Sequence, residues 1–241
     1  MDDISTILAQ NWLNLIALVW FMICFRGYIY YVKRKSFTTP CLVSVMHMYR
    51  QEWMLRVMDR ENRIADTSAI ANLERSVSFF ASTTMLILAG LMTVLGSTDK
   101  AIDLVADIPF AVLATRQEWE LKILLLIVLF IYAFFKFTWS LRQYGFASVM
   151  IGGAPAPEEQ VSTQVKQVTA DRIAKMTSKA ANNFNTGLRT FYFSQAVLGW
   201  FINPILFMGL AAFVVYILYR REFNSSTLQI LMMSSEPEKK L

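Results

Sequence analysis

Four runs of about 20 mostly apolar residues constrain this chain more than any other feature of its sequence. A helix needs about 20 such residues to cross roughly 30 Å of hydrocarbon. The runs lie at about residues 12–32, 77–96, 121–141 and 197–219. Only 17% of the residues are charged, whereas soluble domains usually carry about 25%. The chain is therefore expected to be all-α: a polytopic membrane protein built as a four-transmembrane-helix bundle.

The fourth apolar stretch needs a separate interpretation. It extends over residues 190–219, about ten residues more than one crossing requires, and it contains Asn203 and Pro204. Proline removes an intrahelical hydrogen bond and clashes with the preceding turn, so Pro204 should kink the helix or mark a change of direction. One kinked, tilted span is favoured, and two half-helices of the kind found in transporters are the alternative.

The distribution of Lys and Arg predicts the orientation. Residues 33–76 and 142–196 form two long, basic connections, whereas the connection after the second run has only Lys100 and Arg116. Under the positive-inside rule the two basic connections are cytoplasmic loops, and both termini then face outward. Arg220 and Arg221, at the outer end of the fourth span, count against this scheme.

Residues 1–223 are expected to form a single membrane domain, with amphipathic helices in the two cytoplasmic loops. In the first loop, Met46, Tyr49, Trp53 and Val57 recur at helical spacing. In the second loop, a helix is expected to start near Pro157 and to end near residue 181. Residues 224–241 are expected to form a polar, disordered tail.

Residue types that carry chemistry are scarce within the spans. All 18 Asp and Glu residues lie outside the four runs, which argues against a cation-coupled transporter that relies on a buried carboxylate. His47 is the only histidine, and Cys24 and Cys41 lack the clustering of a disulfide or zinc site. No catalytic residue, metal site or cofactor is expected, and the protein is not expected to be an enzyme.

Two features inside the spans have alternative interpretations. Arg26 and Lys136 either extend their charges to the cytoplasmic interface or form an anion or headgroup site there. The second run has a face of small residues, which predicts close helix packing, with a polar pore lining in an oligomer as the alternative. This candidate packing face consists of Ser78, Ser82, Ala89 and Thr93.

Several segments resemble a known family. They are ENRI (61–64), NLERSVSFFASTT (72–84), EWELK (118–122), FFKFTWSLR (134–142), NFNTGLR (183–189) and YRREF (219–223). The chain is similar over roughly residues 10–223 to the bacterial membrane proteins grouped as domain of unknown function 599 (DUF599). The resemblance implies a multi-pass protein of the bacterial inner membrane, in which the two outward-facing termini would lie in the periplasm, and it implies no activity.

The matching segments carry polar residues that should gather at the cytoplasmic face of the membrane. They could form a headgroup or anionic-ligand site, or an ion-paired network, such as Glu74 with an arginine, that fixes the bundle. The candidate residues are Arg63, Asn72, Glu74, Arg75, Lys136, Arg142, Asn185 and Arg189.

These observations predict a non-enzymatic accessory or scaffold protein, or a lipid-contacting protein, of the inner membrane. The alternatives are an oligomeric channel or transporter for a small solute or anion and, third, a membrane-embedded enzyme. The expected partners are the lipid bilayer, with anionic headgroups at the cytoplasmic face, and a second copy or another membrane protein. Nucleic acid is not expected, because the basic residues flank apolar runs and form no single soluble patch.

Overall fold

The structure of the chain is a computed structural model that describes residues 2–36, 38–106 and 115–233, and the regular elements in these ranges are all helical. The long helices are α1 (Asp2–Lys35), α3 (Ile64–Gly96), α5 (Arg116–Gly152), α6 (Thr163–Leu198) and α7 (Pro204–Phe223). The shorter ones are α2 (Leu42–Met58), α4 (Thr98–Ala106), the 3-10 turn η1 (Gly199–Phe201) and α8 (Ser226–Met232).

Four helical segments of the described chain are long and apolar enough to cross a membrane. They are Trp12–Lys35, Ile64–Gly96, Arg116–Gly152 and Pro204–Met232. The expectation of an all-helical chain with four such segments is therefore confirmed. Three of the segments extend well past the apolar runs from which they were predicted. An apolar run shows which residues could lie in the hydrocarbon, whereas a helix can continue beyond it into polar surroundings.

The helix boundaries are set by local caps. Thr115 starts α5 with a capping box, in which its side chain accepts from the backbone N–H of Glu118 and its own N–H donates to the Glu118 carboxylate. Ser162 starts α6 by accepting from the N–H of Val165. The helix expected to begin near Pro157 therefore begins at Thr163, and it continues to Leu198 instead of ending near residue 181.

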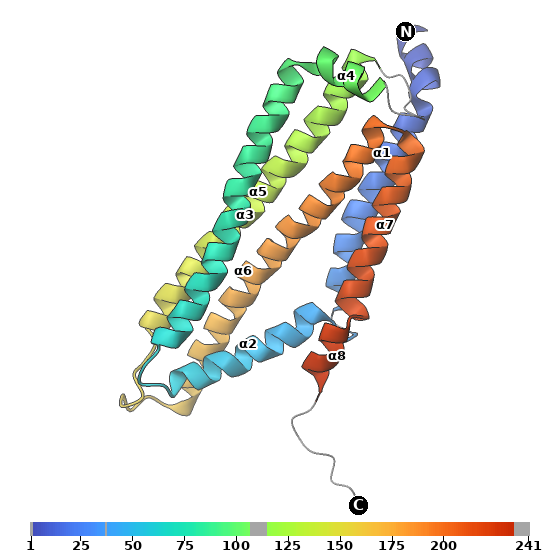
Figure 1. Ribbon diagram of the computed structural model, residues 1–241. Coiled ribbons are helices and arrows are strands. Elements are labelled where there is room, and N and C mark those ends of the chain that lie inside the picture. The colour runs from blue at the N-terminus through green and yellow to red at the C-terminus, as the bar shows by residue number, and fades with distance from the viewer. Residues whose placement is uncertain (1, 37, 107–114, 234–241) are drawn as a thin grey trace, which may run out of the picture.

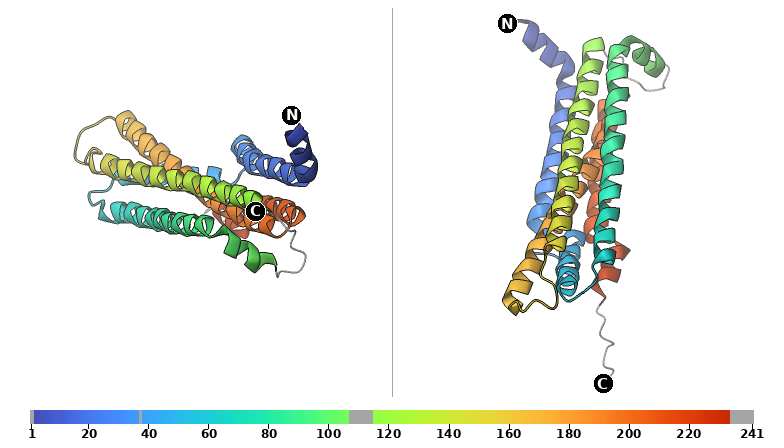
Figure 2. Two further views of the ribbon diagram at one scale, coloured as in Figure 1. Left: turned by 90° about the horizontal axis from the view of Figure 1, so that it is seen from above. Right: turned by 90° about the vertical axis from the view of Figure 1, so that its left-hand side faces the viewer.

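The long helices form an elongated bundle (Figures 1 and 2). Helix α5 packs between α3 and α6, and α7 packs on both α1 and α6. Helix α2 lies across one end of the bundle and packs on α6, while α4 lies at the opposite end. We call the end that holds Lys35, α2 and α8 the basic end and the end that holds α4 and η1 the far end.

Residues 190–219 do not form the single kinked span favoured by the sequence. Helix α6 ends at Leu198, η1 follows, and α7 runs back beside α6 from Pro204 (Figure 1). Asn203, which precedes the proline, has an extended backbone (φ −156°, ψ 135°), and its side chain accepts from the N–H of Ile205 at 2.8 Å. Proline disfavours a helical conformation in the residue before it and is well suited to a first helical turn. Pro204 therefore marks a change of direction.

This reversal changes the path of the chain through the bundle. Helix α6 runs from the basic end to the far end, and α7 returns, so that α1 begins at the far end and α7 ends at the basic end (Figure 1). The sequence analysis expected both termini on the same side. It did not predict that α6 runs the length of the bundle, because the first half of this helix is polar. Lys35 Nζ lies 3.4 Å from the Tyr219 hydroxyl, so Arg220 and Arg221 lie close to the basic residues that end α1.

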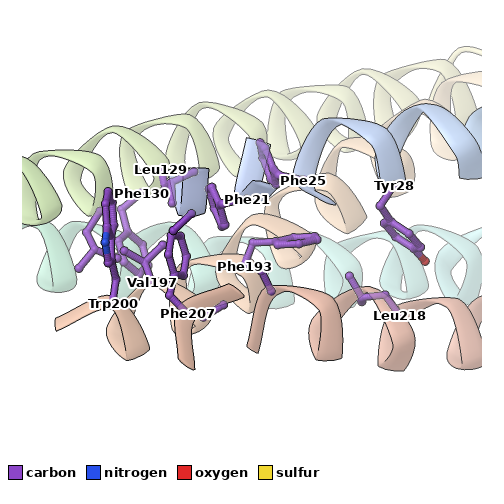
Figure 3. Close-up of a cluster of buried hydrophobic side chains, with 14 of the residues drawn as sticks. Phe21, Phe25, Tyr28, Leu129, Phe130, Phe193, Val197, Trp200, Phe207 and Leu218 are labelled. Carbon is purple, nitrogen blue, oxygen red and sulfur yellow. The ribbon is translucent and has the colours of Figure 1, made fainter. Parts of the chain in front are cut away.

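Aromatic side chains dominate the core between α1, α6 and α7 (Figure 3). Phe21 lies with its ring centroid 5.1 Å from that of Phe207 and 6.0 Å from that of Phe193, and Trp200 stacks on Phe207 at 4.9 Å. Hydrogen bonds near this core also connect α1 to its neighbours: Trp20 Nε1 donates to the Met208 carbonyl, and Trp200 Nε1 donates to Asn14 Oδ1. Aromatic pairs at these separations stabilise a core beyond the area that they bury.

A second core joins α2, α3, α5 and α6 around Phe137, which is fully buried. Its ring packs against Gly187 of α6 so closely that a Cβ at position 187 would lie 2.4 Å from Phe137 Cε1. Only glycine therefore allows α5 and α6 this approach.

The segment expected to be a disordered tail is partly helical. Residues Ser226–Met232 form α8, which Ser225 caps, and the Tyr49 hydroxyl of α2 donates to the Leu231 carbonyl at 2.9 Å. Residues 234–241 lie outside the described part of the chain.

Candidate functional site at the basic end

A buried ion pair joins α6 and α7 near the basic end. Arg189 Nη2 lies 3.2 Å from Glu222 Oε2, and the two residues are only 8% and 7% exposed. The other carboxylate oxygen, Glu222 Oε1, accepts from the backbone N–H of Val43 at 3.1 Å. Val43 lies in the first turn of α2, where unpaired N–H groups and the helix dipole favour an anion. One carboxylate therefore links α2, α6 and α7.

Tyr28 of α1 completes this junction. The guanidinium of Arg189 lies 5.7 Å from the centre of the Tyr28 ring, a distance typical of a cation–π contact. The Tyr28 hydroxyl is buried and has no hydrogen-bond partner among the described residues. In Figure 3 it points away from the aromatic core. Phenol, guanidinium and carboxylate groups from three helices thus meet at one place.

Lys35 closes the basic end of α1 inside an aromatic cage. Its ammonium donates to the Tyr31 hydroxyl at 2.7 Å and lies 5.0–5.3 Å from the ring centres of Tyr31, Tyr219 and Phe223. Two of these rings belong to α7, so the cage fastens the last turn of α1 to the end of α7.

The residues singled out from the sequence belong to separate groups of contacts. Lys136 of α5 donates to Asn183 Oδ1 of α6 at 3.3 Å, and the side-chain amides of Asn183 and Gln143 are hydrogen-bonded at 2.8 Å. Lys136 thus belongs to an α5–α6 network, whereas Arg189 belongs to the α2–α6–α7 junction. Arg26, the other cation within the spans, lies on the exposed face of α1.

Arg63 binds backbone carbonyl groups at the corner between α2 and α5. Nη1 donates to the carbonyls of Ile151 and Ala154 at 3.2 and 2.8 Å, Nη2 to that of Pro155 at 2.5 Å, and Nε to that of Val57 at 3.2 Å. These carbonyls lie at the C-terminal ends of α5 and α2, where a cation is favoured. Arg63 therefore holds the corner closed.

The other candidates lie nearer the surface. Arg75 donates to Asn72 Oδ1 at 3.1 Å, and the guanidinium of Arg142 lies 5.6 Å from the Phe146 ring. Glu74 lies close to Gly145 of α5: a Cβ added at position 145 would lie 3.8 Å from Glu74 Oε1. Asn185 is partly buried on α6. Glu74 was expected to pair with an arginine, but it forms no ion pair among the described residues, and Arg189 pairs with Glu222.

The candidate packing face of the second span lies on the outside of the chain. Ser78, Ser82, Ala89 and Thr93 are all exposed, because α3 packs chiefly on α5 through its other side. This face therefore does not serve packing within one copy of the described bundle.

Helix α6 lines a groove on each of two sides. A groove of about 470 Å³ runs between α6 and α7, with Tyr192 and Arg221 among its lining residues. A groove of about 350 Å³ lies between α2 and α6, lined by Gln51, Leu55 and Val168 among others. Asp171 also lines this groove, and hydrogen bonds from Lys175 and then from Gln51 hold the pKa of its carboxyl group below its usual value.

Three buried charged residues were missed in the sequence. Glu222 lies just beyond the predicted fourth span, at residues 197–219. Asp66 is buried at the start of α3, where it accepts from Trp53 Nε1 and from Arg60. Lys122 is buried near the far end and donates to the Trp200 carbonyl at 3.0 Å. A charged residue next to an apolar run was the signal in the sequence that could have identified them. Their partners could not be identified in this way, because they come from other parts of the chain.

The described residues include no group of three or more His, Cys, Asp and Glu side chains arranged to hold a metal ion. His47 Nδ1 lies 2.8 Å from the Ser178 hydroxyl and connects α2 to α6. The polar groups at the basic end mostly bind one another. Their contacts fix the relative positions of the helices.

A helical bundle with four apolar segments of this length defines a class, that of membrane-type helical proteins. Within that class the chain belongs to the family described as "Protein of unknown function, DUF599", whose family model matches residues 16–227. The resemblance found in the sequence is thereby confirmed. No curated protein and no solved structure matches the chain.

Proposed function

We propose that the protein is a multi-pass protein of the bacterial inner membrane that acts without catalysis, as an accessory or scaffold protein that docks a partner at its basic end. The observation that carries this proposal is the groove between α2 and α6, in which the apolar side chains of Leu55 and Val168 lie beside Gln51, Gln167 and Asp171.

The outward-facing side chains support membrane embedding. Leu86 of α3 is 74% exposed, Phe135 of α5 is 64% exposed and Ile205 of α7 is 65% exposed, and all lie on apolar segments. Water opposes such a continuous apolar exterior, whereas hydrocarbon accepts it.

The charges support an orientation. Lys33, Arg34 and Lys35 end α1, and Arg220 and Arg221 end α7 beside them. The positive-inside rule then makes the basic end cytoplasmic. With α6 as a fifth crossing, the N-terminal end of α1 is periplasmic and the end of α7 is cytoplasmic.

Helix α2 and the first half of α6 form what we call the platform. Met48 and Leu55 of α2 and Val165 and Val168 of α6 are exposed on it. Leu55 and Val168 line the same groove, together with Gln51, Gln167 and Asp171. Exposed apolar side chains with a charged rim are typical of protein docking surfaces.

The internal contacts of the platform support a docking role over a catalytic one. His47 of α2 contacts Ser178 of α6, and Val43 of α2 donates to Glu222 of α7. Glu222 in turn pairs with Arg189 of α6. These contacts hold α2 on α6 and α7. A rigid platform keeps a docking surface pre-formed and so lowers the entropy cost of binding.

A photo-crosslinking amino acid at Leu55 or Val168, in cells that express the full chain, tests this function. The expected result is one defined second protein attached at both positions, and the same protein released in stoichiometric amount in native mass spectrometry. The matched control is Ile205, which is as apolar and more exposed (65% against 43% for Leu55 and Val168) but lies near the far end. Identical products at all three positions, or a homo-oligomer as the only species, would overturn the proposal.

An oligomeric channel or transporter is the second candidate, and the exposed small-residue face of α3 favours it. Ser82 and Ala89 lie seven residues apart on that face, and small residues allow helices of two copies to approach closely. Ser82→Leu should then reduce the oligomer and any solute flux in liposomes. An unchanged stoichiometry would remove this candidate.

A further inference from the structure

The groove between α6 and α7 is polar at one end and apolar along the rest. Figure 1 shows the two helices diverging from their reversal towards the basic end. Tyr192 and Arg221 line the end of the groove that lies towards the basic end, and Leu210, Val214 and Ile217 line its apolar part. Its volume of about 470 Å³ falls in the range of about 300–1,000 Å³ that is usual for small-ligand sites.

The polar end of the groove carries an unneutralised cation. Arg221 Nη1 donates to the Tyr192 hydroxyl at 3.1 Å, and its guanidinium lies 5.1 Å from the Tyr192 ring. Among the described residues Arg221 has no ion pair, because the adjacent Glu222 binds Arg189 and Val43. A guanidinium has five N–H donors in a fork that matches phosphate, so most of its donors remain for a ligand.

Gln195 lies between the cation and the apolar part. It follows Tyr192 by about one turn of α6 and is exposed in the groove. Along the groove the order is therefore guanidinium, amide and aliphatic side chains. A membrane lipid presents its groups in the same order, namely phosphate, ester carbonyl and acyl chain.

We propose that this groove binds an anionic phospholipid of the cytoplasmic leaflet, with its phosphate on Arg221, an ester carbonyl near Gln195 and one acyl chain along Val214 and Leu210. The proposal rests on the membrane embedding proposed above and is independent of the platform. Charge complementarity selects the occupant, since a basic residue at this interface attracts anionic headgroups. A short groove with one polar end fits an amphiphile better than it fits a whole helix.

The test uses the full chain in mild detergent, stripped of its lipid and titrated with phosphatidylglycerol or phosphatidylcholine in native mass spectrometry. The wild type should retain phosphatidylglycerol preferentially. Arg221→Gln should weaken that preference about fivefold, the effect of one interfacial cation. The matched control is Arg220→Gln, which removes the same charge from an exposed neighbour that does not line the groove. An equal loss of the phosphatidylglycerol preference in the two variants would mean that general surface charge causes the effect, and it would contradict the proposed site.

A second pair of variants tests the apolar part. Val214→Trp should fill the groove and lower the retention of both lipids, whereas Phe135→Trp, on the outer face of α5, should not. If Val214→Trp fails to fold, Gln195→Leu replaces it and should weaken phosphatidylglycerol retention without affecting thermal stability. Equal retention of the two lipids by the wild type, or a protein occupying the groove, would contradict the proposal. Crosslinking at Leu55 reports on the platform separately, so the two proposals can fail independently.

Discussion

Arg189 and Glu222 lie 33 positions apart in the sequence and form a 3.2 Å ion pair between α6 and α7. The same carboxylate accepts from Val43 at the start of α2. Three helices therefore depend on one glutamate that the sequence places just beyond an apolar run. A charge is kept in such a place only when it is paired, since an unpaired buried charge is strongly unfavourable.

Glu222→Gln should lower the free energy of unfolding by about 3–5 kcal/mol, the usual cost of removing one partner of a buried pair. Arg189 would remain buried without its counter-charge, and the first turn of α2 would lose its anion. Thermal unfolding in detergent measures the change.

Arg142→Gln is the control for this experiment, because Arg142 is exposed and forms no ion pair among the described residues. The double variant Arg189→Met with Glu222→Gln should recover part of the loss, since no unpaired charge remains. A Glu222→Gln variant as stable as the Arg142→Gln variant would show that the pair contributes nothing.

Gly187→Ala should destabilise the bundle by about 1–3 kcal/mol, the typical effect of overpacking a core. The added Cβ would meet the Phe137 ring at 2.4 Å, and the ring cannot move far because Phe80, Phe184 and Phe191 surround it. Gly209→Ala is the matched control, because nothing lies within 4 Å of its added Cβ. Helix propensity favours alanine there by up to about 1 kcal/mol. Equal stabilities of the two variants would argue against close α5–α6 packing.

Arg63→Lys should loosen the corner between α2 and α5. A lysine has one ammonium group and cannot reach the four carbonyls that the guanidinium binds. We expect a loss of about 1–2 kcal/mol and faster hydrogen exchange in the last turn of α5. Arg75→Lys, which changes only an exposed contact with Asn72, should leave that exchange unchanged. Unaltered exchange in the Arg63→Lys variant would contradict the role of the guanidinium.

A reporter fused after Glu238 should read as cytoplasmic in a bacterial host, because α7 ends at the basic end. A reporter in the connection after α4 should read as periplasmic. A periplasmic signal after Glu238 would mean that α6 does not cross the membrane and would restore the four-span topology with both termini outside.

Parts of the fold follow directly from the sequence, and particular residues show where this stops. The apolar runs indicated the four helices, and the spacing of Met46, Tyr49, Trp53 and Val57 indicated α2. Helix α6 was recognised only as a loop helix, because its first half carries Lys166, Arg172 and Lys175 and resembles a surface helix. The last residues of α6, by contrast, are mostly apolar and are soon followed by the apolar residues of α7, so that the sequence favoured one long span there.

The candidate polar residues show the same division. The sequence indicated that Arg63, Lys136 and Arg189 lie towards the basic end, because charged residues next to apolar runs mark the membrane interface. Their partners are the carbonyls at the end of α5, Asn183 and Glu222, and no spacing rule connects residues so distant in the chain.

The sequence by itself determined the helical class, the membrane-type segments, the basic character of one end and the family. These depend on composition and local order, which act over one helix at a time. Only the tertiary structure decided that the chain reverses at Pro204, that Glu222 pairs with Arg189, and that the small face of α3 lies outside. Each of these depends on which helices pack together, and packing is set by side-chain shape and charge between segments far apart in the chain.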